Sequence, residues 1–201
     1  EFTAIDFGWL GYDLPGEDSI GTQPDMLEYV ASRAAAWNSH VSLDGRLDAL
    51  EKHPRTADNL KVLRRWEEFR LEHGLSDDQR ERLRDISHEH HLLLNEDGSY
   101  ELVRMTPLPT AANGDPRVRA FSFRRADRAY VMYWHPKGSQ SLELPGKSPD
   151  LSLYTNLRDT SESIDRSGTS ITLPLGRVRY LATDGGSREE LTEAVRRAHV
   201  V

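Results

Sequence analysis

The spacing of apolar residues along the chain changes near residue 95. Before that point, short apolar runs alternate with stretches in which apolar residues recur every three to four positions, which predicts alternating strands and helices. Residues 3–44 have the pattern strand, loop, helix from Pro24 to Trp37, and strand. Such a unit is typical of parallel sheets. Two further helices are expected over residues 56–72 and 76–94.

The expected helices carry recognisable start and stop signals. Gly74 follows the helix over residues 56–72 and is expected to end it. A capping box places a short polar side chain at the helix start and an acidic or amide side chain three residues later. Three pairs have this spacing: Thr22 with Asp25, Ser76 with Gln79, and Ser187 with Glu190.

After residue 95 the pattern becomes one of short strands separated by turn residues. This spacing, about 8–14 residues from strand to strand, is typical of an antiparallel β-sandwich. The expected strands are 100–105, 118–123, 130–134, 141–144, 151–154, 169–173 and 178–181. A last helix is expected over residues 188–199. The sequence therefore predicts an α/β segment, residues 1–95, followed by an all-β domain with a terminal helix, residues 96–201.

Composition and charge narrow the classes of function. The chain has 201 residues, of which 37% are hydrophobic and 29% charged, and its net charge is −7. This acidic balance argues against a nucleic-acid partner, and no apolar run reaches the roughly 18 residues that a membrane span needs. The absence of cysteine excludes disulfides, thiolate metal sites and a cysteine nucleophile. The compartment stays open.

The first residues resemble the middle of a buried strand. Apolar residues crowd from Phe2 to Phe7, and Gly8 and Gly11 follow them. A domain seldom begins inside its own core strand, so we expect the chain to be the C-terminal portion of a longer protein.

The order of elements resembles a known architecture. It is similar to the last two βα units of a (β/α)8-barrel glycoside hydrolase followed by that family's C-terminal β-sandwich, with alpha-L-fucosidase-like barrels as the nearest relatives. The segments that carry the resemblance in the second half are 119–125, 129–138, 171–176 and 179–181. The resemblance implies a fold in which these residues are the end of a TIM-like barrel plus a sandwich.

The resemblance also implies a chemistry. Glycoside hydrolases of this kind use two carboxylates that flank the glycosidic bond, at the C-terminal ends of barrel strands. The acidic residues expected there are Asp6 and Asp44, which we take as the catalytic candidates. On this mapping six of the eight βα units lie outside the chain, so the chain alone is not expected to turn over substrate.

Three further residues are candidates for binding the substrate: Trp9, Tyr12 and His40. An exposed indole offers a flat face on which a sugar ring can stack. Each candidate also has a plainer reading. Trp9 can be a core residue, and the Asp6 carboxylate can hydrogen-bond to a loop. Asp44 can cap a short helix over residues 47–50. His40 can be the residue at which a strand begins, with no further role.

A histidine-rich stretch, residues 87–91, suggests a metal site at first sight. On a helix, His88 and His91 would share one face. No third ligand lies at an obvious spacing, and the His-Glu-x-x-His signature is absent. We therefore expect no metal and no cofactor.

Two functions from different classes remain open. In the first, the chain belongs to a carbohydrate-active glycoside-hydrolase-like protein, with a carbohydrate and the remaining N-terminal part of the same protein as partners. In the second, residues 96–201 form a non-catalytic sandwich that binds a glycan or a protein. Unpaired strand edges and apolar faces of a partial barrel also predict self-association. No nucleic acid or membrane is expected.

Overall fold

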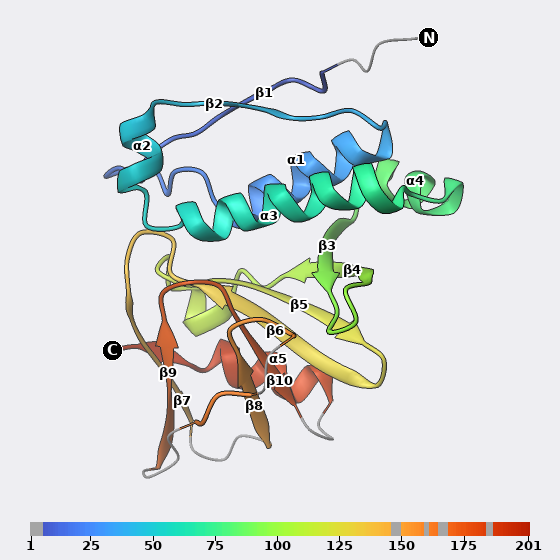
Figure 1. The fold of residues 1–201 in the computed structure, drawn as a ribbon. Helices are drawn as coiled ribbons and strands as arrows, with labels where there is room; N and C mark the ends of the chain where they lie inside the picture. Colours follow the sequence, from blue (N-terminus) through green and yellow to red (C-terminus); the bar gives the residue numbers. More distant parts are fainter. Residues whose placement is uncertain (1–5, 146–149, 159–160, 165–168, 184–186) are drawn as a thin grey trace, which may run out of the picture. The chain divides into compact units, whose positions relative to one another are not determined.

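The computed structural model describes residues 6–145, 150–158, 161–164, 169–183 and 187–201. The chain forms two compact units, which divide between Leu92 and Leu93. Figure 1 labels the elements of both units. Residues 3–5 of the expected opening strand lie outside the described residues.

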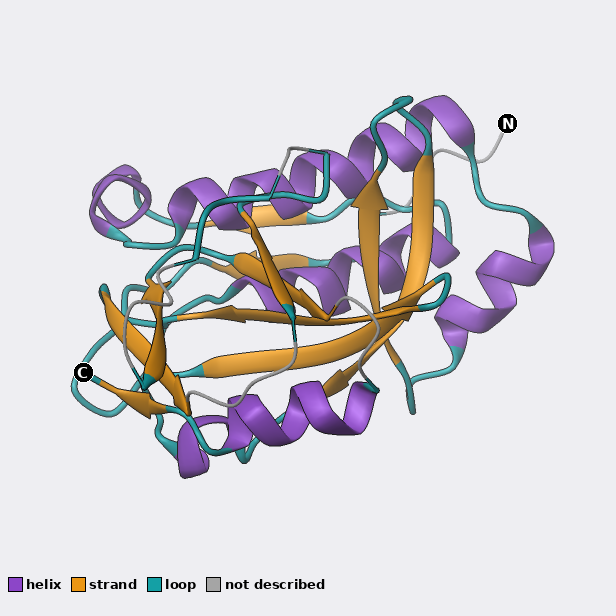
Figure 2. Cartoon of the chain, turned by 90° about the horizontal axis from the view of Figure 1, so that it is seen from below, coloured by secondary structure: helices purple, strands orange, loops and turns teal. Residues whose placement is uncertain are grey.

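The first unit contains one small parallel sheet and a group of helices (Figures 1 and 2). Its elements are β1 (Trp9–Gly11), α1 (Pro24–Ala36), β2 (Ser42–Asp44), α2 (Leu47–Lys52), α3 (Thr56–Glu68), the π-helical turn η1 (Phe69–His73) and α4 (Asp77–Arg84). β1 and β2 pair in parallel, with Trp9 opposite Ser42 and Gly11 opposite Asp44. The strand–helix–strand pattern predicts this pairing. Helix α1 packs against α3 and α4.

A buried carboxylate joins the elements of the first unit. Glu28 of α1 is fully buried, and its Oε1 atom accepts hydrogen bonds from Arg65 Nη2 at 3.0 Å and from His91 Nδ1 at 2.6 Å. Its Oε2 atom accepts one from Trp66 Nε1 at 2.6 Å. Burial opposes ionisation, but His91, Arg65 and Trp66 together outweigh it and hold the pKa of Glu28 below its ordinary value. Glu28 is thus an anion that α3 and the start of β3 both bind.

Two arginines join the ends of α1 and α4. Arg33 of α1 donates to the carbonyl oxygens of Leu83 and, at 2.6 Å, of His88. Arg84 of α4 donates to the Ala36 carbonyl at 3.3 Å and stacks over the Trp37 ring. Each guanidinium therefore donates a hydrogen bond to a carbonyl at the C-terminal end of the other helix, where carbonyls lack partners within the helix.

The expected helix over residues 76–94 is wrong in its second half. The capping box of Ser76 and Gln79 starts α4 as predicted, but α4 ends at Arg84 and Asp85 is extended. The Asp85 carboxylate accepts hydrogen bonds from the backbone and hydroxyl of Ser87, which turns the chain. Residues 89–94 then form strand β3 (Glu89–Leu94), whose inner residues are all buried. A run that is buried throughout gives no periodicity by which a strand and a helix can be told apart.

The other cap predictions had mixed outcomes. Ser187 and Glu190 form the predicted capping box of α5, and Gly74 ends the helical segment at positive φ. Thr22 does not cap α1, whose N-cap residue is Gln23 and which has no side-chain cap. Its hydroxyl instead donates to Gly11 O at 3.0 Å and accepts from Asp13 N at 2.9 Å.

The second unit consists of antiparallel sheets. Its elements after β3 are β4 (Tyr100–Pro107), η2 (Ala111–Gly114), β5 (Arg119–Arg125), β6 (Arg128–Trp134), β7 (Gln140–Pro145), β8 (Leu151–Tyr154), β9 (Ser170–Leu175), β10 (Arg179–Thr183), α5 (Arg188–Arg196) and β11 (His199–Val200). Six strands form one sheet in the order β3-β4-β5-β6-β10-β8, and three form another in the order β11-β7-β9. The seven expected strands are confirmed within two residues, whereas β11 was not predicted.

Alternation along β5, β6 and β10 gives the large sheet two apolar faces. Val131, Tyr133 and Leu181 face a cluster that also holds residues of the small sheet and of α5. The other face carries aromatic residues, among which Phe123 stacks on Tyr130 with ring centroids 5.2 Å apart. The layer against the first face thus combines three strands with a helix. This arrangement differs from the two all-strand layers of the predicted sandwich.

The Glu28 network predicts a large effect on stability. Replacing Glu28 by Gln leaves the Arg65 guanidinium buried without a counter-charge, which should lower the free energy of unfolding by about 3 kcal/mol. Urea unfolding followed by circular dichroism measures it. Glu68→Gln is the matched control, because Glu68 pairs with the exposed Arg64 at 2.6 Å, and its loss should cost less than about 0.5 kcal/mol. Equal effects would contradict the role of Glu28.

Candidate functional site: the outer face of β1 and β2

Three polar side chains meet where β1 and β2 begin. Asp6 Oδ2 accepts a hydrogen bond from Ser42 Oγ at 2.5 Å and lies 3.7 Å from His40 Nε2. Asp6 Oδ1 accepts one from Gly8 N at 3.0 Å. Gly8 has a φ of 143°, a conformation that side-chain-bearing residues rarely adopt. The structure therefore brings together two of the predicted residues, Asp6 and His40.

Asp6 lies before the described strand β1. The pairing of the two strands begins with Phe7 N donating to His40 O at 2.9 Å, and β1 itself starts at Trp9. Asp6 thus precedes β1 and lies at the N-terminal end of the parallel pair. The strand expected before Asp6 lies outside the described residues, and the described strand β1 begins three residues after Asp6.

Strand alternation divides the side chains of β1 and β2 between two faces. Trp9 and Ser42 are opposite each other and point to the same side, and Asp44, two residues after Ser42, points to that side as well. Leu10 and Leu43 point to the other side and are half-buried. We call the side that carries Asp6, Trp9, Ser42 and Asp44 the outer face.

The outer face presents an open indole. Trp9 is 78% exposed, the highest value among the exposed large apolar side chains of the described residues. Trp37, the other strongly exposed tryptophan, is covered on one face by the Arg84 guanidinium, 4.2 Å from the ring centroid. Of the two interpretations left open for Trp9, a sugar platform and a core residue, this exposure excludes the core. Its role in binding stays a prediction.

Tyr12 belongs to the core, and its assignment to a sugar-binding surface is corrected. It is 3% exposed, and its hydroxyl is 2.7 Å from Thr56 Oγ1 and accepts from Asn59 Nδ2 at 3.1 Å. A Cβ atom added at Gly45 would lie 2.7 Å from Tyr12 Cβ. The physical reason is alternation, since Tyr12 has the parity of Leu10 and points away from the outer face.

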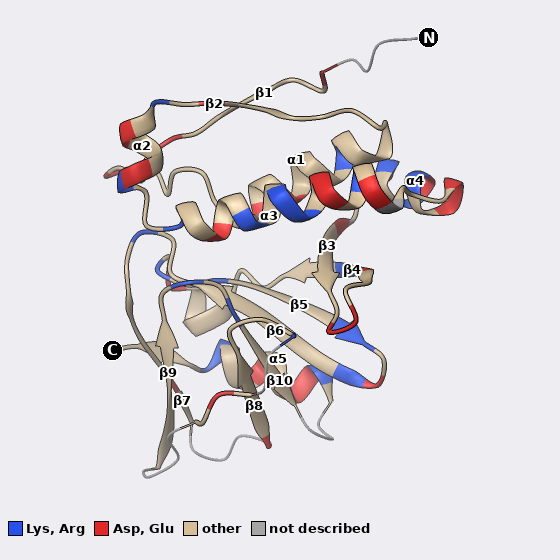
Figure 3. Ribbon diagram, viewed as in Figure 1, with Lys and Arg blue, Asp and Glu red and all other residues tan. Residues whose placement is uncertain are grey.

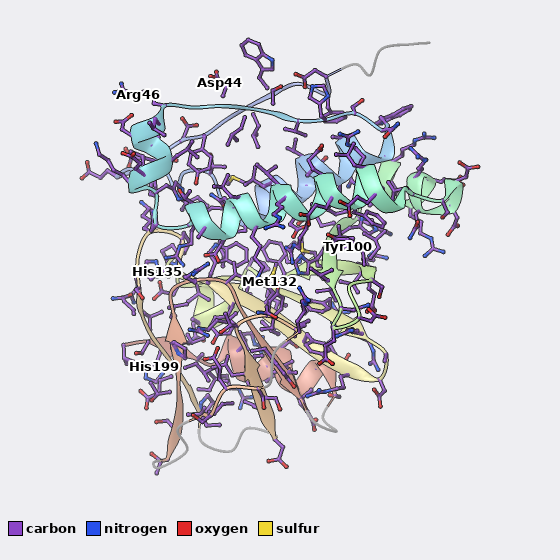
Figure 4. The ribbon with its side chains drawn as sticks, in the orientation of Figure 1. Asp44, Arg46, Tyr100, Met132, His135 and His199 are labelled. Carbon is purple, nitrogen blue, oxygen red and sulfur yellow. The ribbon has the colours of Figure 1, made fainter. Side chains whose placement is uncertain are left out.

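Asp44 ends β2 and is exposed. Figure 4 shows its side chain directed away from helices α1 and α3. It does not cap α2, whose N-cap residue is Arg46 and which has no side-chain cap. Along the strand Asp44 lies about 7 Å from Ser42, the residue that holds Asp6. Asp6 and Asp44 therefore share one face, but no hydrogen bond among the described residues joins them.

The electrostatics of this face are acidic. No lysine or arginine occurs in residues 6–15 or 38–45, whereas Figure 3 shows both signs of charge on the helices of the first unit. The hydrogen bond from Ser42, with that from Gly8, holds the pKa of Asp6 below its ordinary value. A general acid needs a raised pKa, so Asp6 is suited to accept hydrogen bonds at neutral pH and not to donate a proton.

Ser42 is the residue that the sequence analysis missed. Its register opposite Trp9 follows only from the strand pairing, and no motif in the sequence marks it. The histidines of residues 88–91 do not share a helix face, because residues 89–94 form a strand. Among the described residues, no group of three potential ligands is placed to hold a metal ion. No described helix has the length and apolar character of a membrane span.

Comparisons with known proteins leave the family open. No family model and no curated protein matches the chain. Solved structures that match include a GH30 endoxylanase from Clostridium papyrosolvens at 9% identity and a TM-score of 0.31, over 88% of this chain and 42% of that one. An alpha-amylase from Anoxybacillus matches at 10% identity and 0.28, over 79% and 33%. An alpha-amylase from Geobacillus thermoleovorans matches at 11% and 0.32, over 89% and 39%.

These likenesses are distant. The chain spans less than half the length of each of these structures, and their TM-scores are too low to support an argument about its fold or its activity. The barrel-end assignment and the narrower resemblance to alpha-L-fucosidases therefore stay predictions from the sequence.

The hydrogen bond from Ser42 predicts a measurable shift. Ser42→Ala should raise the pKa of Asp6 towards its ordinary value, as followed by the side-chain carboxyl ¹³C shift in an NMR pH titration. Asp97 is the internal control, because Ser99 lowers the pKa of its carboxyl in the same way and is unchanged in the variant. Since the pKa of Asp6 lies below its unfolded value, its carboxylate stabilises the native state above that value, and this contribution is lost as the pH falls. An unmoved Asp6 titration would contradict the assignment.

Proposed function

We propose that the outer face of β1 and β2 binds a carbohydrate. The observation that carries this proposal is the indole of Trp9, which is 78% exposed and lies in register with Ser42. A sugar ring stacked on an indole buries its C–H edge, while its hydroxyl groups reach polar atoms beside the ring. An indole this exposed leaves apolar surface in contact with water, which is unfavourable. A bound ligand would cover that surface.

The polar groups beside Trp9 suit sugar hydroxyls. The Asp6 carboxylate is ionised and has acceptor capacity beyond the hydrogen bonds from Ser42 and Gly8. His40 is 45% exposed in its side chain and supplies a ring nitrogen that can donate or accept. Asp44 offers a second carboxylate further along the same face. Asp6 Oδ2 and His40 Nε2, which lie 3.7 Å apart, are close enough to bind two vicinal hydroxyls.

The acidic charge of this face favours neutral sugars. Uronic acids would meet Asp6 and Asp44, and the nearest arginine in the sequence, Arg46, is already paired with Asp48 at 2.9 Å. The ligand class we assign is therefore a neutral oligosaccharide.

Hydrolysis is proposed for a larger protein and not for these residues alone. A glycosidase needs one carboxyl that donates a proton, and the lowered pKa of Asp6 opposes that role. The larger protein would be glycoside-hydrolase-like and, in the narrower resemblance, alpha-L-fucosidase-like. Its catalytic pair would then come at least in part from polypeptide outside this chain. Asp6, Trp9, His40 and Asp44 would border its sugar site.

The rival function, a glycan-binding module formed by residues 96–201, has less support. Among the described residues of the second unit, Val201 is the only large apolar side chain that is exposed. Tyr133 and Trp134, which the sequence places in the most aromatic strand, are fully buried. The described part of this unit thus offers no open aromatic platform comparable to Trp9.

Trp9→Ala tests the binding face. Titration calorimetry with xylohexaose, maltoheptaose and a neutral fucosylated oligosaccharide should show binding of at least one to the wild-type chain. The variant should bind that sugar about tenfold more weakly or worse, as expected for a central aromatic contact. Trp37→Ala is the matched control and should bind as the wild type does. Unfolding of Trp9→Ala should change by less than about 0.5 kcal/mol, because the side chain is exposed. Failure of all three sugars to bind, or equal binding by Trp9→Ala, would sink the proposal.

A second experiment separates binding from hydrolysis. We expect no release of 4-nitrophenol from a panel of 4-nitrophenyl glycosides by residues 1–201, because the lowered pKa of Asp6 makes it a poor proton donor to the leaving oxygen. Asp6→Asn and Asp44→Asn should behave identically to the wild type in this assay while weakening sugar binding in calorimetry. Turnover by the wild type that either variant abolishes would instead place that residue in the catalytic machinery.

A further inference from the structure

The edge of β2 that faces away from β1 has unused hydrogen-bonding groups. Ser42 N donates to Gly8 O at 3.1 Å, and Asp44 O accepts from Tyr12 N at 2.7 Å, so residues 42 and 44 bond towards β1. In a parallel ladder the alternate residues, Val41 and Leu43, direct their N–H and C=O groups the other way. None of the hydrogen bonds found within the described part of the chain engages these four groups.

The corresponding edge of β1 is partly closed. Trp9 and Gly11 direct their backbone groups away from β2, but Thr22 Oγ1 donates to Gly11 O at 3.0 Å and accepts from Asp13 N at 2.9 Å. The loop that contains Thr22 therefore satisfies part of that edge. Of the two edges, the one formed by Val41 and Leu43 is the more open, because none of its four groups has a partner among the hydrogen bonds of the described residues.

A two-stranded parallel sheet is an incomplete structure by itself. Parallel sheets normally contain more strands and have both faces covered, and isolated two-stranded pairs are marginal in water. A third strand along Val41–Leu43 would pair four backbone groups and extend the inner apolar side that Leu10 and Leu43 begin. The edge is short, which limits the affinity of such an addition.

The side chains beside this edge define the occupant. On the outer face a third strand would lie next to Ser42 and the exposed Asp44, about 4.5–5.5 Å from directly opposite side chains. The nearest cation in the sequence, Arg46, pairs with Asp48 at 2.9 Å and has no ion pair with Asp44 among those of the described residues. On the inner side its neighbour is Leu43, which is half-buried. A partner strand with basic side chains at alternate positions and β-branched apolar side chains between them matches both sides.

A second copy of the chain matches poorly. Two β2 strands paired antiparallel about Leu43 would place both Asp44 carboxylates on one face as diagonal neighbours, about 7–8 Å apart, where like charges repel. We propose that the open edge of β2 binds an extended peptide in trans that alternates lysine or arginine with valine or isoleucine. This inference does not depend on carbohydrate binding.

Fluorescence anisotropy with two labelled peptides tests the proposal on the full chain. One peptide alternates lysine with valine over seven residues, and the other alternates glutamate with valine. The lysine peptide should bind about threefold to tenfold more tightly than the glutamate peptide, because one or two of its side chains lie opposite or diagonal to Asp44. Asp44→Lys should reverse the order of the two peptides. Equal affinities, or an order that Asp44→Lys leaves unchanged, would overturn the proposal.

Hydrogen exchange and a backbone variant locate the contact. Binding of the lysine peptide should slow exchange of the Val41 and Leu43 amides, whereas binding elsewhere would leave both unchanged and contradict the assignment. Leu43→Pro removes a donor that β1 does not use and should abolish binding, while Leu43→Val keeps the donor and should retain it. Near-ultraviolet circular dichroism checks that Leu43→Pro keeps the native fold, and the Asp44→Lys reversal stands independently of it. Sedimentation showing a dimer that Leu43→Pro dissociates would replace the peptide by a second copy.

Discussion

The first unit depends on one buried anion. Glu28 lies in the interior of α1, and its two oxygens bind Arg65 and Trp66 of α3 and His91 of β3. A carboxylate cannot be buried without partners, so its burial forces three elements distant in sequence into one arrangement. The helices α1 and α3, and through the Arg33 and Arg84 contacts also α4, are fixed around this group. The remaining features of the unit are attached to this frame.

The parallel strands are attached to the frame mainly at one end. The Tyr12 hydroxyl contacts Thr56 and Asn59 of α3, and the Asn59 amide also donates to Thr22 O at 2.9 Å. This anchor fixes the orientation of β1 and hence which side chains are turned outwards. With Tyr12 and Leu10 inside, Trp9 has to lie outside, beside the Asp6 and Ser42 pair. The same geometry leaves the backbone of Val41 and Leu43 at an open edge. The groups proposed to face ligands therefore lie on the side of β1 and β2 that is turned away from the core.

The second unit is organised by a different principle. Its large sheet is apolar on both faces, and aromatic pairs such as Phe121 with Trp134, 5.7 Å apart and nearly parallel, line one of them. α5 and the small sheet cover the other face. Charged residues lie mainly at strand ends and turns, as in the pair of Arg125 Nε and Glu101 Oε2 at 2.8 Å. This unit is built for packing, and its described surface offers little for ligand stacking.

The sequence by itself determined the local elements. Period-two alternation identified the strands of the second unit, and short-range chemistry identified the starts of α4 and α5 at Ser76 and Ser187, because capping involves residues only three positions apart. The change of pattern near residue 95 and the parallel pairing of β1 with β2 were also visible. What failed locally was the segment after Arg84, where a uniformly buried run carries no period and Asp85 ends the helix through its own turn.

Only the tertiary structure decided the composition of the candidate site. Asp6 and Ser42 are 36 residues apart, and their contact depends on the register between β1 and β2. The same register turned Tyr12 into a core residue and Trp9 into a surface residue, although both are aromatic and lie in one segment. Register is a property of long-range packing, and a shift of one residue would exchange the two faces. Residue types alone therefore named the candidates, and packing chose among them.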